Sequence, residues 1–444
     1  MKISIVGTGY VGLVTAACLA EVGHTVTCVD VDATKVDKVN AGVSPIHEAS
    51  LDDLLDEHVG TRLSATTNLR LAVAETELTL IAVGTPTSDG QIDLRQVIAA
   101  AGEVGEALAE KTGYHVVVVK STVIPGTTEG PVRRELESRS GKKVGGDIGL
   151  GMNPEFLRQG RAVFDSLNPD RIVLGGSDDR SIEAMAAVYA PYEDVEVLST
   201  TPRTAEMIKY AANSLFATLI SFSNELANFC ATEGDIDAAD VMRGLHLDRR
   251  LSPLLETGER IHPELLSYLM PGCGFGGSCF PKDVAALVSR GSAIGSEMQL
   301  LQSVLDVNEA QPMKLIEMLL AELESLDGVP VAVLGLSFKP GTDDMRQSPA
   351  IPVVESLVAA GAIVTVYDPV ARPVAERVFS TLPLRFAEGI TDALADTEAV
   401  LVLTAWPEFL ELPQLVNSSS PPVIVDGRRT LAASDFARYR AIGL

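Results

Sequence analysis

The sequence predicts an α/β fold in which two α/β domains flank a central helical domain. Over residues 1–203, short apolar runs alternate with helical stretches, which is typical of a doubly wound parallel sheet. Helical periodicity dominates residues 204–326, and the alternating pattern returns over residues 327–444. At 444 residues the chain is also longer than a single hydrophobic core usually serves, so we expect three domains with these boundaries.

The N-terminal elements predict a βαβ unit. Residues 3–6 form a short apolar run, residues 10–22 have the periodicity of a helix, and residues 25–29 form a second apolar run. Further buried strands are expected at residues 78–83, 116–119 and 172–174.

The central region is expected to contain a long linking helix. Residues 205–231 keep helical periodicity without Pro or Gly, over a length that exceeds an ordinary crossover helix. In the C-terminal region we expect a helix at residues 350–360 and strands at residues 331–334, 363–366, 400–403 and 423–425.

Composition excludes several classes of function. The formal net charge of -25 and pI near 4.6 oppose binding to nucleic acid or anionic membranes, because the mean field repels polyanions. No run approaches the roughly 20 apolar residues of a membrane span, and Met1 leads directly into the first strand without a signal-like leader. The five cysteines form no metal-ligand CxxC pattern, so we expect a cytoplasmic protein with reduced thiols and no metal.

A glycine turn follows the first predicted strand. Gly7, Gly9 and Gly12 permit a tight turn, close approach of a pyrophosphate, and close packing of the following helix on the strand. The helix N-terminus supplies amide donors to the phosphates. Asp30 ends the second strand, where its carboxylate can bind both ribose hydroxyls and repel a 2′-phosphate. These features predict a Rossmann-like domain that binds NAD rather than NADP.

Cys279 has the setting of a reactive cysteine. It follows the glycine-rich residues 272–277 and precedes Pro281, which suits the first turn of a helix. A thiol at a helix N-terminus loses its proton more readily, so Cys279 is the expected nucleophile. Cys18, Cys28 and Cys230 are expected to be inert, buried, small apolar residues, and Cys273 has no role that we can assign from the sequence.

Three further polar residues are candidates for catalysis. Lys209 and Asn213 are four residues apart on the predicted long helix, so they share one face. They can offer a cation and an amide donor to an oxyanion, a task that favours preorganised donors. Asp283 lies one helical turn after Cys279 and can hold a water molecule or help to move a proton.

Seven motifs occur in a fixed order along the chain. They are GTGYVG at residues 7–12, VGTPT at 83–87, STV at 121–123, NPEFL at 153–157, KYAAN at 209–213, GFGGSCFPKD at 274–283 and GLSFKPGTDD at 335–344. With these motifs the chain resembles the UDP-glucose/GDP-mannose dehydrogenase family over nearly its whole length. The resemblance implies a domain order of NAD-binding domain, helical dimerisation domain and nucleotide-sugar-binding domain, assembled as a homodimer or higher homo-oligomer.

The resemblance also implies a reaction. Members oxidise the primary alcohol of a nucleotide sugar to a carboxylate in two hydride transfers to NAD, and here UDP-glucose is the expected substrate. The aldehyde formed first is captured by the Cys279 thiolate, the thiohemiacetal is oxidised to a thioester, and water releases the acid. Thr122 and Glu155 are implied to order that water, with Glu155 as the expected base.

Individual binding residues are carried over from the family by resemblance, most of them inside the seven motifs and the others, including Asp30 and Arg428, outside them. The expected cofactor contacts are Gly7, Gly9, Tyr10, Val11, Gly12, Asp30, Lys35, Thr85, Thr122, Lys282 and Arg346. The expected substrate contacts are Glu155, Phe156, Leu157, Lys209, Asn213, Arg250, Phe275, Gly276, Phe338, Lys339 and Arg428.

The chain departs from the family pattern at three places. Gln159 stands where members commonly carry a second glutamate, and the loop after Glu48 lacks their usual Pro-Gly. Residues 252–270 look longer than in common members, so either Arg249 or Arg250 is a candidate to reach the substrate of a neighbouring subunit.

Three alternatives stay open from the sequence. The substrate could be GDP-mannose or a UDP-hexosamine, although enzymes for hexosamines tend to carry His in place of Ser278. A noncatalytic nucleotide-sugar sensor is the remote alternative, because such a protein has no need to keep Cys279, Lys209 or Asn213.

Overall fold

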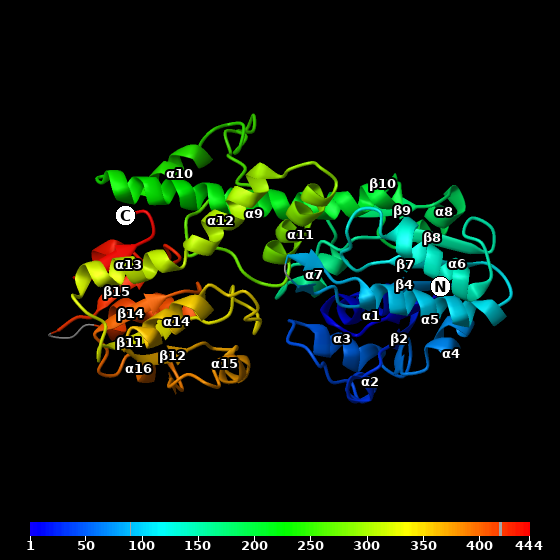
Figure 1. The fold of residues 1–444 in the computed structure, drawn as a ribbon, viewed down its shortest axis with the longest axis horizontal. Helices are drawn as coiled ribbons and strands as arrows, with labels where there is room; N and C mark the ends of the chain where they lie inside the picture. The colour runs from blue at the N-terminus through cyan, green and yellow to red at the C-terminus, as the bar shows by residue number, and fades with distance from the viewer. Residues whose placement is uncertain (89, 417–419) are drawn as a thin grey trace. The chain divides into compact units, whose positions relative to one another are not determined.

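The structure is a computed structural model that describes residues 1–88, 90–416 and 420–444. The chain divides into two compact units, Met1–Ala212 and Asn213–Leu444. Figure 1 shows that each unit contains a sheet flanked by helices. The predicted fold class, two parallel sheets with helical sequence between them, is confirmed. The predicted three-domain boundaries stay a prediction.

The first unit is built on an eight-stranded sheet with the order β10-β9-β8-β7-β4-β1-β2-β3. All neighbours in it pair in parallel except β8 and β9. Its strands are β1 (Lys2–Val6), β2 (Thr25–Val29), β3 (Leu63–Thr66), β4 (Leu78–Ile81), β7 (His115–Val119), β8 (Ile148–Met152), β9 (Ile172–Gly176) and β10 (Val197–Thr200). A separate small hairpin joins β5 (Thr87–Ser88) and β6 (Gln91–Ile92).

Helices cover both faces of this sheet. They are α1 (Tyr10–Glu21), α2 (Ala33–Asn40), α3 (Leu51–His58), α4 (Leu69–Glu75), α5 (Arg95–Glu110), α6 (Arg133–Ser140), α7 (Ala162–Leu167) and α8 (Asp179–Val188), with a π-helical turn at Thr128–Val132. Alternate residues of β7 enter different cores: Val116 and Val118 pack on the α1 side, and Val117 and Val119 on the α5 side. Because β7 is buried on both faces, its sequence is a continuous run of apolar residues.

The second unit contains most of the helical region. The long helix α9 (Pro202–Glu233) crosses the boundary between the units and extends the predicted residues 205–231 at both ends. It is followed by α10 (Ala238–His246), a 3₁₀ turn at Glu264–Tyr268, α11 (Phe280–Ala293), α12 (Gln299–Ala310) and α13 (Met313–Glu322). Among the described residues, none of the helices combines the length and the apolar character that crossing a membrane requires.

A six-stranded parallel sheet completes the second unit, with the order β13-β12-β11-β14-β15-β16. Its strands are β11 (Pro330–Leu334), β12 (Ile363–Tyr367), β13 (Arg385–Phe386), β14 (Ala399–Val402), β15 (Val423–Asp426) and β16 (Tyr439–Ala441). The accompanying helices are α14 (Ala350–Ala359), α15 (Arg372–Val378), α16 (Ile390–Ala393) and α17 (Leu412–Leu415), with 3₁₀ turns at Pro407–Glu411 and Ala433–Asp435.

The strands predicted from the sequence correspond to β1, β2, β4, β7 and β9 in the first unit and to β11, β12, β14 and β15 in the second. The other strands were not predicted. The predicted strands at 78–83 and 400–403 extend beyond the observed ends at Ile81 and Val402. β8 went undetected because Gly149 and Gly151 interrupt its apolar run. Both glycines lie under large side chains, since a Cβ would come within 2.4 Å of the Tyr114 hydroxyl at Gly149 and 2.5 Å of the Met185 sulfur at Gly151.

Candidate active site

The glycine turn after β1 has the shape that a dinucleotide requires. Gly7 has a φ of +103°, and a Cβ there would lie 2.7 Å from the carbonyl oxygen of Ala82. A Cβ on Gly12 would lie only 1.9 Å from the carbonyl oxygen of Gly7. Among the described residues, no atom lies within 4 Å of a Cβ built on the exposed Gly9, so the backbone there is open to a ligand. The three glycines therefore serve the turn, the helix packing and the approach of phosphate, as NAD binding needs.

Asp30 follows β2 and is held by the same turn. Its Oδ2 accepts hydrogen bonds from the Thr8 amide at 2.8 Å and the Thr8 hydroxyl at 2.6 Å, and its Oδ1 accepts one from the Asp32 amide at 3.0 Å. Partial burial opposes ionisation, but these hydrogen bonds, with Lys35 nearby, hold the pKa of Asp30 below its usual value. The carboxylate is thus charged and fixed where it can bind ribose and repel a 2′-phosphate.

The remaining predicted cofactor residues of this unit lie beside these strand ends. Val11 is in the first turn of α1, Thr85 follows β4 and Thr122 follows β7, and all three are partly buried.

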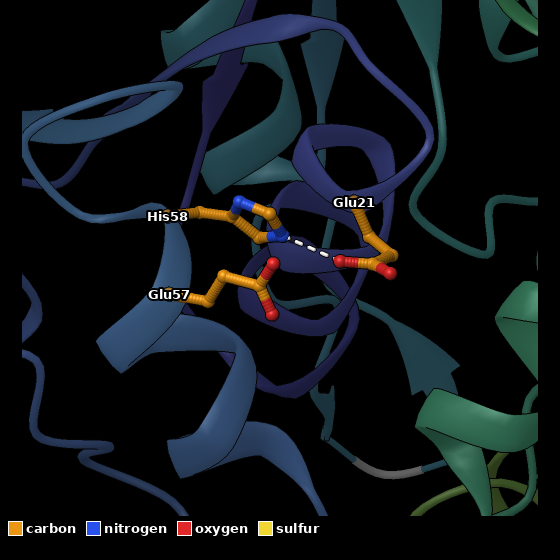
Figure 2. A group of neighbouring side chains, drawn as sticks. All are labelled: Glu21, Glu57 and His58. Carbon is orange, nitrogen blue, oxygen red and sulfur yellow. Dashed lines mark hydrogen bonds and ion pairs between the residues drawn. The ribbon is translucent and has the colours of Figure 1, made fainter.

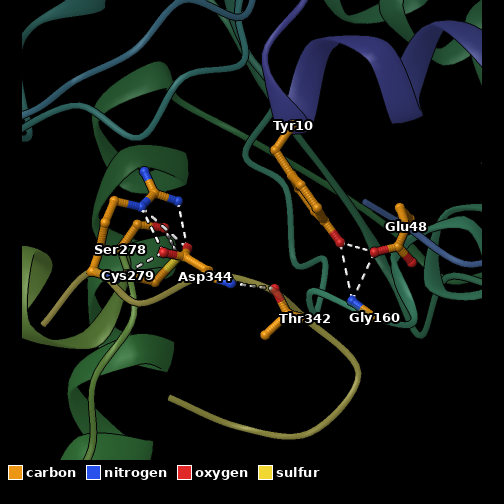
Figure 3. A network of polar contacts seen from close by, with 8 residues as sticks. Tyr10, Glu48, Gly160, Ser278, Cys279, Thr342 and Asp344 are labelled. Atoms are coloured by element: carbon orange, nitrogen blue, oxygen red, sulfur yellow. Dashed lines mark hydrogen bonds and ion pairs between the residues drawn. The ribbon is translucent and has the colours of Figure 1, made fainter. Parts of the chain in front are cut away.

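Tyr10 connects the glycine turn to the loop after the NPEFL motif (Figure 3). The buried Glu48 accepts hydrogen bonds from the Tyr10 hydroxyl, from the Gly160 amide at 2.7 Å and from the Ala162 amide at 2.7 Å. Burial and the Glu48 carboxylate raise the pKa of Tyr10, so the phenol keeps its proton. Sequence reasoning noted the unusual loop after Glu48 but did not identify its bonding role.

A buried charged cluster lies at the ends of β7 and β8. The Lys209 ammonium is 3.0 Å from the Glu155 carboxylate, with side-chain exposures of 4% and 7%. Lys120 donates a hydrogen bond of 2.8 Å to the Asn153 side chain. Lys120, Asn153 and Glu155 line a cavity of about 70 Å³, which is enough space for water.

Lys120 was missed from the sequence, although it directly precedes the STV motif. Burial lowers its pKa to about 8, with the neighbouring Lys209 acting in the same direction and Glu155 opposing. Burial also disfavours the Glu155 carboxylate, but Lys209, the Leu157 amide and Lys120 outweigh it and keep the pKa of Glu155 low. A carboxylate held in the charged form is a weak base. This environment supports the expected role of ordering water more than the role of base.

Phe156 and Leu157 lie beside this cluster. The Phe156 ring has the Arg171 guanidinium 3.9 Å and the Lys209 ammonium 5.5 Å from its centroid. The Leu157 amide donates a 2.6 Å hydrogen bond to Glu155. These contacts fix the ring and the carboxylate against Lys209.

In the second unit, Cys279 is partly buried and directly precedes α11, with Pro281 in the first turn as predicted. The Ser278 hydroxyl lies 3.8 Å from its sulfur. Asp344 binds the Arg346 guanidinium through its two carboxylate oxygens at 2.6–3.1 Å. The hydrogen bonds to Asp344 raise the pKa of Arg346, and the charge of Cys279 adds to that effect. Arg346, expected at cofactor phosphates, thus lies within electrostatic range of the thiol.

The glycines before Cys279 allow close packing. A Cβ on Gly276 would lie 2.3 Å from the carbonyl oxygen of Gln347, and one on Gly277 would lie 2.9 Å from the Phe338 ring. Phe275 is buried against Phe280, with their ring centroids 6.0 Å apart. Phe275 therefore contributes to the core beneath the loop.

Asp283 is almost fully buried and holds two of the predicted site residues. Its carboxylate accepts a 2.6 Å hydrogen bond from the Asn213 amide and lies 2.5 Å from the Lys282 ammonium. Asn213 is thus fixed by Asp283, and Lys282 is directed to the same carboxylate. The sequence spacing did not reveal this pairing of Asn213 with Asp283.

The Arg428 guanidinium forms hydrogen bonds with backbone carbonyl groups. Its guanidinium donates to the carbonyl oxygens of Leu403 at 2.6 Å, Gly274 at 3.1 Å and Phe338 at 3.4 Å. The predicted substrate contact therefore also joins the loops that carry Phe338 and the cysteine segment. The Lys339 ammonium lies 5.8 Å from the Phe338 ring centroid. Arg250 is exposed and forms an ion pair with Asp248 at 2.5 Å.

One group outside these clusters has the composition of a metal site. One possible metal-ligand atom from each of Glu21, Glu57 and His58 lies within 4.8 Å of the other two (Figure 2). The His58 ring is 2.6 Å from the Glu21 carboxylate, so an ordinary hydrogen bond accounts for the arrangement. The group lies at the end of α1 opposite the glycine turn, and the proposed reaction makes no use of it.

Known proteins share this organisation. The chain matches the UDP-glucose/GDP-mannose dehydrogenase family in its NAD binding domain over residues 1–193, its central domain over 203–310 and its UDP binding domain over 332–433. It is 43% identical over 448 residues to the UDP-glucose 6-dehydrogenase AglM of Haloferax volcanii, covering 100% of both chains. It is 41% identical over 372 residues to a GDP-mannose 6-dehydrogenase of Azotobacter vinelandii, covering 83% of this chain and 81% of that one.

A solved UDP-glucose dehydrogenase from the archaeon Pyrobaculum islandicum is also similar. Its TM-score is 0.90 at 39% identity, with 99% of this chain and 97% of that chain covered. The predictions of NAD as cofactor and of a nucleotide-sugar dehydrogenase are thereby confirmed at the level of the family. The chain belongs to the UDP-glucose/GDP-mannose dehydrogenase family.

Proposed function

We propose that this chain oxidises the C6 alcohol of UDP-glucose to the carboxylate of UDP-glucuronate, with Cys279 as the covalent nucleophile. The observation that carries the proposal is the position of Cys279 at the start of α11, within electrostatic range of Arg346. A helix N-terminus and a guanidinium both favour the thiolate over the thiol. Only the thiolate can attack an aldehyde efficiently at neutral pH.

The glycine turn and Asp30 are the residues that would hold NAD. When bound, NAD accepts the hydride that leaves the sugar carbon in each of the two oxidations. Thr8 and Asp32 keep the Asp30 carboxylate in place before any ligand arrives. The geometry thus supports a preorganised ribose site that excludes a 2′-phosphate.

The Cys279 sulfur adds to the aldehyde carbon formed by the first oxidation, and a C–S bond results. Loss of hydride from this thiohemiacetal leaves a thioester. Water then attacks the carbonyl carbon, the C–S bond breaks, and the thiolate is released together with the carboxylate. This order keeps the aldehyde on the protein between the two oxidations.

Lys209 is proposed to stabilise the developing oxyanions. Lys120 and Lys209 surround the single carboxylate of Glu155, so the buried cluster has an excess of positive charge when both lysines are protonated. Such preorganised charge is worth more in a buried site than in water. The cavity beside Glu155 provides space for the water that the last step consumes.

GDP-mannose is the second candidate substrate, because a GDP-mannose 6-dehydrogenase is 41% identical to this chain. The presence of Ser278 favours UDP-glucose over UDP-hexosamines. UDP-glucose is favoured over GDP-mannose because the similarity to a UDP-glucose 6-dehydrogenase covers 100% of this chain, whereas the similarity to the GDP-mannose 6-dehydrogenase covers 83% of it.

We also propose that the chain forms a homodimer through α9. An exposed or partly exposed apolar stripe repeats with the 4-3 spacing of a helix interface, at Leu215, Leu219, Phe222, Leu226 and Phe229. Leu215, Phe222 and Phe229 are 53%, 43% and 61% exposed. Aromatic and leucine side chains at this spacing are typical of helix pairs.

The substrate assignment predicts a ranking of nucleotide sugars. With NAD, UDP-glucose should give a kcat/KM at least tenfold above those of GDP-mannose, UDP-N-acetylglucosamine and UDP-N-acetylmannosamine, measured by NADH absorbance. A higher kcat/KM for GDP-mannose would contradict UDP-glucose as the substrate and identify the protein as a GDP-mannose dehydrogenase. No NADH with any of the four would refute a dehydrogenase of these nucleotide sugars.

The cofactor site predicts a strong preference for NAD over NADP. Asp30→Ala should lower the ratio of kcat/KM with NAD to kcat/KM with NADP. The variant removes both the hydrogen-bond acceptor for the ribose and the charge that repels a 2′-phosphate. Asp37→Ala is the matched control and should leave this ratio unchanged, since it removes an exposed carboxylate from α2. Equal use of both cofactors by the unchanged protein would contradict this account.

The covalent mechanism predicts that Cys279→Ser lowers acid formation by several orders of magnitude, because a hydroxyl supplies little nucleophile at neutral pH. Binding of NAD and UDP-glucose, followed by calorimetry, should persist. Cys273→Ser, which changes a buried cysteine six residues earlier, is the control and should retain turnover. Full production of two NADH per sugar by the Cys279 variant would refute covalent catalysis.

Lys209→Ala serves as a comparison for that experiment. It should lower kcat by about 10²-fold, the usual scale for losing one oxyanion donor. Because the variant also removes the ion-pair partner of Glu155 and can destabilise the protein, kcat is calculated per mole of folded protein. A change confined to KM would make Lys209 a binding residue only.

The proposed dimer predicts that Phe222→Asp gives a monomer, because a charge in an apolar interface is costly to bury. Molecular mass by light scattering should fall to half that of the unchanged protein. Glu225→Asp, on the same helix, is the control. An unchanged mass for Phe222→Asp would exclude the stripe as the interface.

A further inference from the structure

The segment before Cys279 is buried without regular structure. Residues 271–277 are all buried, yet they belong to no helix or strand. Each buried backbone amide and carbonyl in such a segment needs a partner, because an unpaired one costs free energy comparable to a lost hydrogen bond. The partners must therefore come from outside the loop.

Side-chain amides of α9, of α12 and of Gln311 directly after α12 supply several of these partners. Asn224 accepts a 2.8 Å hydrogen bond from the Gly272 amide, and Gln311 donates a 3.0 Å hydrogen bond to the Gly272 carbonyl. Asn228 in turn donates to the Gln311 side chain at 2.9 Å. The backbone of Gly272 is thus held on both its donor and its acceptor.

Asn308 does the same at Phe275 with one side chain. Its Oδ1 accepts from the Phe275 amide at 2.7 Å, and its Nδ2 donates to the Phe275 carbonyl at 3.0 Å. Gly274 has a φ of +99°, and a Cβ there would lie 2.8 Å from the Asn308 Oδ1. The glycine therefore allows the amide to approach the backbone closely.

Phe275 is the last residue held in this way before the nucleophile. Beyond it, Gly276 and Gly277 have no side chain to restrain them, and the Gly277 amide donates to the Arg346 carbonyl at 2.8 Å. A movement of Phe275 is transmitted to Cys279 through only three intervening residues. A shift of about 1 Å in a reacting group can cost about 10²-fold in rate.

We propose that Asn308 is a positioning residue that fixes the Cys279 thiol for capture of the aldehyde. The inference rests on the proposed nucleophilic role of Cys279. The side-chain amide of Asn308 acts through its two hydrogen bonds to the backbone of Phe275.

The test compares Asn308→Ala with Gln302→Ala, a control that removes an amide from the exposed side of the same helix, where Gln302 bonds Asp306. In Asn308→Ala, hydrogen exchange of the peptide spanning residues 272–277 should accelerate at least tenfold. The kcat should fall at least tenfold while KM for NAD changes by less than threefold. Aldehyde, trapped as an oxime, should be released by Asn308→Ala and not by the control or the unchanged protein.

Unchanged exchange would refute the restraint of the loop, and faster exchange with unchanged kcat and no released aldehyde would refute positioning. If Asn308→Ala does not fold, Asn308→Asp is used, which keeps the acceptor for the Phe275 amide and should give a smaller loss of kcat. The exchange measurement needs no substrate. If the unchanged protein does not oxidise UDP-glucose, the proposed function is contradicted. The restraint of the loop by Asn308 is still tested by the exchange measurement.

Discussion

Parallel strand pairing is the constraint on which the rest of the structure depends. Parallel neighbours place their carboxyl ends at one edge of a sheet, where chain segments leave the strands and can bind ligands. In the first unit the glycine turn follows β1 and Asp30 follows β2. In the charged cluster, Lys120 follows β7 and Glu155 follows β8. In the second unit, Phe338 follows β11 and Arg428 follows β15. Residues far apart in the sequence are thereby gathered within each unit.

The polar groups gathered in this way are buried and must compensate one another. Breaking a buried ion pair such as Lys209 with Glu155 typically costs about 3–5 kcal/mol, because one charge is left without a partner. The same reasoning applies to Asp283, which is almost fully buried between Asn213 and Lys282. These pairings keep the charges of the candidate site in fixed places before a ligand binds, as oxyanion stabilisation requires.

Much of this could be predicted from the sequence because some functions demand particular residues at short spacing. The glycines of the turn, Asp30 at a strand end and Cys279 before Pro281 are of this kind. Lys120 and Asn308 carry no such local signal, since their roles depend on partners that folding brings close: Asn153 is 33 residues from Lys120, and Phe275 is 33 residues from Asn308. Arg428 was recognised by its resemblance to a substrate contact of the family, yet its hydrogen bonds to three backbone carbonyls required the structure.

The central claim is that Cys279 carries the sugar covalently between the two oxidations. The most direct measurement is mass spectrometry of the peptide containing Cys279 after rapid acid quenching during turnover with UDP-glucose and NAD. The account predicts an added mass equal to the UDP-sugar acyl group on that peptide, and its disappearance when turnover is complete. An unmodified Cys279 peptide at every time point, while UDP-glucuronate accumulates at full rate, would contradict the claim.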